Sequence, residues 1–134
     1  GWYGGADQAP DIPRDDAVIS EAELCAYASA LERNGFFGPD SYYMNNPGNA
    51  AYAATALNEG ILEMPTLFLL AEYDEVCECL RSNLAGPMRN YCRDLTIRHI
   101  QSGHWMAQEK PGEVNAALLR WLATTLPPCW PGDA

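Results

Sequence analysis

The sequence has little positive charge, with 8 Lys and Arg residues against 18 Asp and Glu residues and a net charge of −10. A nucleic acid partner needs clustered basic side chains to meet its phosphates, so we expect none. We interpret the scattered acidic groups as a solvated surface. No apolar run approaches the roughly 18 residues that a membrane-spanning helix needs, so we expect no membrane span.

The sequence also lacks a basic, apolar leader and begins at Gly1 rather than Met. We interpret this start as the result of processing or as the start of an internal piece of a longer chain, and we expect a cytoplasmic protein. The five cysteines are an odd number and fit no disulfide framework, so reduced thiols are expected. Cys77 and Cys79 form a C-x-C without a second pair, a spacing unlike the usual zinc sites, so we expect neither a metal nor a cofactor.

What the chain does contain is 134 residues, 48% of them hydrophobic, which is enough for one domain with a core. Residues 20–23 read Ser-Glu-Ala-Glu, a capping box that predicts a helix to about Asn34, with Gly35 as its stop. An aromatic segment with turn residues follows at 36–46. Asn46-Pro47 then predicts the start of a second helix that reaches Glu59.

After residue 60 the pattern alternates between strands and helices. The apolar run 66–71 predicts a strand covered on both faces, and 95–100 predicts a second strand. Residues 76–86 between them are expected to be helical, and Pro111 opens a last helix that ends at Pro127-Pro128. Strands that alternate with helices predict an α/β fold with a parallel sheet.

Two residues that follow the predicted strands could carry chemistry. Asp74 comes after the first strand and His104 after the second, and the carboxyl ends of parallel strands lie at one edge of a sheet. A carboxylate that faces one imidazole nitrogen fixes the tautomer and leaves the other nitrogen to take a proton. The alternatives are that Asp74 is only a helix N-cap and that His104 is packed against Trp105. His99, within the second strand, is expected to be structural.

The stretch from Phe36 to Leu126 resembles the C-terminal part of an α/β-hydrolase-fold epoxide hydrolase. The resemblance rests on four motifs in order, Phe37-Gly-Pro-Asp-Ser-Tyr-Tyr-Met-Asn45, Met64-Pro-Thr-Leu-Phe-Leu-Leu-Ala-Glu-Tyr-Asp74, Gly103-His-Trp105, and Glu109-Lys-Pro-Gly-Glu-Val-Asn115 followed by Trp121-Leu122. It covers about two thirds of the chain. It implies that residues 1–60 are a remnant of a helical cap domain and that residues 61–134 are the C-terminal strands and helices of the hydrolase core.

The resemblance also implies roles for individual residues. Asp74 matches the acid of the catalytic triad and His104 its general base. Tyr43, or less closely Tyr42, matches a cap tyrosine that donates a hydrogen bond to the epoxide oxygen, and Tyr42 and Trp105 would contact the substrate. In that family an aspartate attacks a small hydrophobic epoxide, and water activated by the histidine hydrolyses the alkyl-enzyme ester to a diol. The alternative for both tyrosines is ordinary aromatic packing.

One part of the family's machinery is missing from the sequence. A nucleophile needs a sharp turn between a strand and a helix, and no G-x-S-x-G occurs, while Asp7, Asp11, Asp15 and Asp16 follow no apolar strand. Three hypotheses remain open: part of an epoxide hydrolase, a non-catalytic relic that acts as an interaction module, or another hydrolase such as an esterase or haloalkane dehalogenase. We therefore expect the chain alone to be inactive and to need a missing N-terminal segment or self-association.

Overall fold

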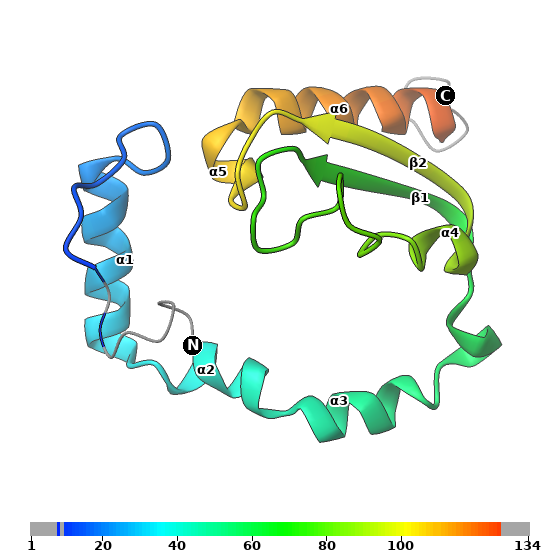
Figure 1. Cartoon of the computed structure of the whole chain (residues 1–134), viewed down its shortest axis with the longest axis horizontal. Helices are drawn as coiled ribbons and strands as arrows, with labels where there is room; N and C mark the ends of the chain where they lie inside the picture. Colours follow the sequence, from blue (N-terminus) through cyan, green and yellow to red (C-terminus); the bar gives the residue numbers. More distant parts are fainter. Residues whose placement is uncertain (1–7, 9, 127–134) are drawn as a thin grey trace, which may run out of the picture.

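A computed structural model describes residue 8 and residues 10–126 of the chain. The elements follow an open curve (Figure 1), in which three helices lead to a two-stranded sheet with a long helix beside it. The first helix, α1 (Glu21–Asn34), approaches the short helix α5 (Met106–Glu109), which follows the sheet (Figure 1). The Tyr27 hydroxyl of α1 donates a hydrogen bond to Oε1 of Gln108 in α5 at 3.4 Å. None of the described helices is long and apolar enough to cross a membrane.

The first predicted helix is confirmed as α1, together with its capping box. The Ser20 hydroxyl accepts the amide of Glu23 at 3.3 Å, and the Glu23 carboxylate accepts the amide of Ser20 at 2.8 Å. Gly35 ends the helix with φ 72°, and its amide donates to the carbonyl of Leu31 at 2.7 Å. A residue with a side chain would be strained at that φ, so the stop signal read from the glycine has a physical basis.

The segment between residues 36 and 60 differs from its prediction in two ways. The aromatic segment is itself a helix, α2 (Phe37–Met44), rather than a run of turns. The next helix, α3 (Asn46–Ala53), ends well before Glu59, and a short 3₁₀ turn, η1 (Leu57–Gly60), follows it. The long helix is excluded because Asn58 and Glu59 have φ of 54° and 56°, which a right-handed helix does not allow.

The predicted parallel sheet is confirmed. β1 (Leu62–Ala71) and β2 (Cys92–Ile100) run parallel, with Thr66 opposite Leu95 and Ala71 opposite Ile100. Both strands begin earlier than their apolar runs, and the register shifts between Leu62 and Pro65, where proline has no amide to donate.

Most of the core lies at the carboxyl end of the sheet, although Cys92 at the start of β2 is also buried. Leu70, Ala71 and Ile100 are buried at the carboxyl end, and Val114 of α6 (Pro111–Thr125) is also buried. The expectation that the strand over 66–71 is covered on both faces holds at Leu70 and Ala71, which are buried, but not over 66–69, which are only half-buried. Figure 1 shows α6 lying along the sheet, and the predicted start of this helix at Pro111 is confirmed. Its predicted end at Pro127-Pro128 lies outside the described residues.

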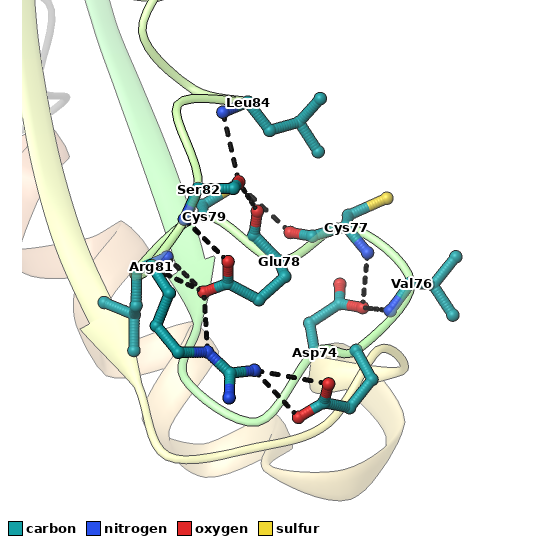
Figure 2. A network of polar contacts seen from close by, with 10 residues as sticks. Asp74, Val76, Cys77, Glu78, Cys79, Arg81, Ser82 and Leu84 are labelled. Atoms are coloured by element: carbon teal, nitrogen blue, oxygen red, sulfur yellow. Dashed lines mark hydrogen bonds and ion pairs between the residues drawn. The ribbon is translucent and has the colours of Figure 1, made fainter.

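The helix predicted over residues 76–86 is wrong. The Glu78 carboxylate accepts the amides of Leu80, Arg81 and Ser82 at 2.6–2.8 Å, and the Ser82 hydroxyl donates to the carbonyl of Glu78 (Figure 2). These side-chain bonds replace the backbone bonds of a helix. The one helical element described between the strands is the single turn α4 (Met88–Tyr91).

We predict that the purified chain is marginally stable or self-associates. Among the described residues β1 pairs only with β2, so its other edge is open to a further strand, and Phe37, Tyr52 and Leu57 are each more than four-fifths exposed. Sedimentation velocity over a range of concentrations should therefore reveal oligomers. Alternatively, a thermal melt followed by circular dichroism should be broad and should change with concentration. A monomer with one sharp melt that does not change with concentration would contradict this prediction.

Candidate active site

The parallel pairing brings Asp74 and His104 together at the carboxyl end of the sheet. Beyond the strands, the amide of Glu72 donates to the carbonyl of Ile100 at 2.9 Å, and the amide of Tyr73 donates to that of Ser102 at 3.0 Å. These two bonds keep the chains side by side as they leave the sheet. As a result, Nδ1 of His104 lies 2.9 Å from Oδ2 of Asp74, although thirty positions separate them.

The Asp74 side chain is fixed by three contacts. Asp74 is buried, with 8% of its surface exposed. Its Oδ1 accepts hydrogen bonds from the amides of Val76 at 2.9 Å and Cys77 at 2.8 Å, which Figure 2 shows as two dashed lines. Burial alone would raise the pKa of the Asp74 carboxyl, but the Cys77 amide, the His104 imidazole and the Val76 amide together lower it. Asp74 is therefore an ionised acceptor at neutral pH. It holds a turn, as the N-cap alternative supposed, but no helix follows it.

His104 is held at one ring nitrogen, and its side chain is partly exposed. A carboxylate that accepts Nδ1–H leaves Nε2 as a proton acceptor, and the His104 side chain is 40% exposed. The ring of Trp105 meets the imidazole edge to face, with centroids 5.4 Å apart. The other described histidine, His99, pairs separately with Glu72 at 3.2 Å. The arrangement can therefore remove a proton from a water molecule that reaches Nε2.

The turn that carries His104 is held by Glu109, which the sequence pattern did not single out for this role. The Glu109 carboxylate accepts the amide of Gly103 at 2.7 Å and the amide of Trp105 at 3.2 Å, one bond on each side of His104. A Cβ at position 103 would lie 3.0 Å from the Glu109 carboxylate, so a larger residue there would push this carboxylate away from the Gly103 amide. The sequence feature that could have predicted this role is an acidic residue four positions after Trp105, one helical turn away.

The structure does not bring the two tyrosines to this pair. Tyr42 and Tyr43 lie on α2, 73% and 64% exposed, with their rings edge to face at 5.3 Å. Figure 1 draws α2 well away from α5 and from the strand ends that carry Asp74 and His104.

Trp105, by contrast, borders a cavity, although His104 itself is not among the residues that line it. The cavity measures about 380 Å³ and is largely apolar. It is lined by residues from the segment before α1, from α1 and from the turn around α5: Val18, Ile19, Tyr27, Leu31, Trp105 and Gln108. The contribution of α1 to this cavity was not predicted from the sequence.

Two further features bear on the chemistry. The turns that follow the two described strands carry Asp74 and His104, so neither of them offers a strand-to-helix elbow for a separate nucleophile. The same region contains three side chains that could hold a metal ion, since ligand atoms of Asp74, Cys77 and His104 all lie within 4.8 Å of one another.

Comparison with known proteins finds that no family model matches the chain. Curated relatives do match. The chain is 36% identical over 118 residues to bifunctional epoxide hydrolase 2 of Rattus norvegicus. The aligned stretch makes up 87% of this chain and 21% of that protein. It is 34% identical over 124 residues to epoxide hydrolase A of Mycobacterium tuberculosis. This aligned stretch makes up 89% of this chain and 36% of that protein.

A third relative, epoxide hydrolase B of Mycobacterium tuberculosis, is 33% identical over 118 residues, which make up 83% of this chain and 31% of that protein. The chain thus spans about a fifth to a third of the length of the relatives it matches. Its two parallel strands with flanking helices fit the C-terminal part of an α/β-hydrolase fold. The expected resemblance is therefore confirmed, and the chain is related to the α/β-hydrolase-fold epoxide hydrolases, with a fold that fits their C-terminal part.

Proposed function

We propose that this chain supplies the water-activating half of an epoxide hydrolase. The observation that carries the proposal is the 2.9 Å contact between Nδ1 of His104 and the buried carboxylate of Asp74 at the carboxyl ends of parallel strands. In this role, Nε2 of His104 removes a proton from water, and the resulting hydroxide attacks an alkyl-enzyme ester. Asp74 stabilises the imidazolium that forms during this step.

The substrate assignment follows from the three relatives described above, each of which is named an epoxide hydrolase. In the proposed reaction, an aspartate from another segment opens a small hydrophobic epoxide and forms the ester, because the sequence offers no nucleophile elbow of its own. The apolar cavity beside Trp105 would receive the hydrophobic part of the substrate. Residues 1–60 would then form part of the cap and residues 61–134 part of the hydrolase core.

Two other functions are kept as alternatives. A non-catalytic relic would retain the fold without a nucleophile, and the coding sequence upstream of residue 1 separates this case from the enzyme. An aspartate at a strand-to-helix elbow there supports the enzyme, and an immediate start codon supports the relic. An esterase or haloalkane dehalogenase would use the same acid and base, and assays of the full-length protein on an ester, a haloalkane and an epoxide separate these chemistries.

The proposal predicts diol formation by the full-length protein and none by the 134-residue chain alone. In the full-length protein, His104→Ala should lower turnover by about 10²- to 10⁴-fold, because it removes the general base. His99→Ala is the matched control, since His99 pairs with Glu72 instead. Chromatographic quantification of the diol checks both results. Turnover by the isolated chain that His104→Ala abolishes would overturn the need for a second segment, and halide release without diol would overturn the substrate.

Tyr43 is proposed as the donor that stabilises the alkoxide formed when the epoxide opens, which requires α2 to lie nearer the strand ends during catalysis. Tyr43→Phe in the full-length protein should then reduce kcat about 10²-fold, the typical effect of removing one such donor. Tyr52→Phe, on the exposed face of α3, should leave kcat unchanged. Equal kcat values for the two variants would assign Tyr43 to aromatic packing.

Glu109 is proposed to position His104 through the two amides on either side of it. Glu109→Ala should destabilise the turn by roughly 1–3 kcal/mol, since it removes two charge-assisted hydrogen bonds from a half-buried site. We expect faster hydrogen exchange at Gly103 and Trp105 and lower turnover. Glu113→Ala, in the exposed first turn of α6, is the control. Unchanged exchange at both amides would contradict the role of Glu109.

A further inference from the structure

We propose that Asp74, Cys77 and His104 form a binding site for a thiol-seeking divalent cation, for which Zn²⁺ is the natural probe. Their ligand atoms all lie within 4.8 Å of one another and comprise a carboxylate oxygen, a sulfur and an imidazole nitrogen. Zn²⁺ binds all three kinds of donor. The sequence spacing gave no sign of this set, because the histidine comes from the other strand.

The local backbone explains why the sulfur lies near the pair. The Asp74 carboxylate binds the amides of Val76 and Cys77 and so folds the chain back over itself directly after β1 (Figure 2). This turn places Cys77 beside the residue that already contacts His104. Two of the three metal ligands, Asp74 and His104, are therefore held by the hydrogen bond between them. The backbone of the third, Cys77, is held by the turn that the Asp74 carboxylate stabilises.

The distances are compatible with a metal ion after a small movement. In a tetrahedral zinc site with bonds of 2.0–2.3 Å, neighbouring ligand atoms are roughly 3.3–3.8 Å apart. Oδ2 of Asp74 and Nδ1 of His104, at 2.9 Å, would separate slightly as the ion takes the position of the shared hydrogen. Any wider separation needs to close by at most about 1 Å to reach this range, which a rotation of the exposed Cys77 side chain can provide.

The neighbouring cysteine differs in its surroundings. The Cys79 thiol donates to the carbonyl of Cys77 at 3.1 Å, whereas the Cys77 thiol is exposed and has no hydrogen bond within the described part of the chain. Three protein ligands leave one position for water, the arrangement of an open zinc site. Because the ion would take Asp74 and His104 away from each other, its binding would also block the general base; that consequence alone rests on the proposed function.

Binding is tested by titrating Zn²⁺ into the full 134-residue chain with the thiols kept reduced and a chromophoric chelator as competitor. We expect one ion per chain, and Co²⁺ in its place should give the charge-transfer absorption of a thiolate ligand. Cys77→Ala and His104→Ala should each weaken Zn²⁺ binding by at least about tenfold. Cys25→Ala, which removes an exposed thiol on α1, should have no effect.

The outcomes separate this site from simple thiol binding and from the catalytic proposal. If Cys79→Ala weakened Zn²⁺ binding as much as Cys77→Ala does, the ion would be assigned to the C-x-C pair, and the proposed site would be overturned. Absence of one-to-one binding, or binding that His104→Ala leaves unchanged, would overturn it as well. The readout needs no substrate, so a failure to bind Zn²⁺ leaves epoxide hydrolysis standing, and a failure of epoxide hydrolysis leaves the ion site standing.

Discussion

The site depends on the parallel pairing of β1 with β2 and on its continuation past the ends of the strands. The bonds from Glu72 to Ile100 and from Tyr73 to Ser102 hold the two exits together, so that a 2.9 Å contact forms between Asp74 and His104. Burial of Leu70, Ala71 and Ile100 at the same end makes the pairing rigid where the chemistry is placed. The remainder of β1 is more exposed, so the burial of this strand is greatest beside the site.

Short-range polar contacts then set the details of the site. Asp74 uses one oxygen for two backbone amides and the other for His104, while Glu109 holds the amides of Gly103 and Trp105. Asp74 and His104 are therefore each fixed by a second set of bonds, as the proposed proton acceptor requires. The turn after β1 places the Cys77 thiol near the pair, so the proposed catalytic pair and the proposed cation site share residues.

The sequence was informative where the signal was local and strong. The capping box at Ser20, the glycine stop at Gly35 and the start of α6 at Pro111 were all predicted, as was the juxtaposition of Asp74 and His104 from strand order. The helix over 76–86 failed because Glu78 binds three amides through its side chain, which apolar periodicity does not reveal. Cys77 and Glu109 were missed because their roles depend on the turns that place them.

In the proposed function, His104 activates the water that cleaves the alkyl-enzyme ester and takes no part in the attack on the epoxide. Intact-protein mass spectrometry of the full-length His104→Gln variant, mixed with one equivalent of epoxide, tests it most directly. If His104 acts only on the ester, a covalent adduct of the epoxide's mass should accumulate and persist while no diol appears. An adduct that turns over at the wild-type rate, or no adduct under conditions where the wild-type protein makes diol, would contradict it.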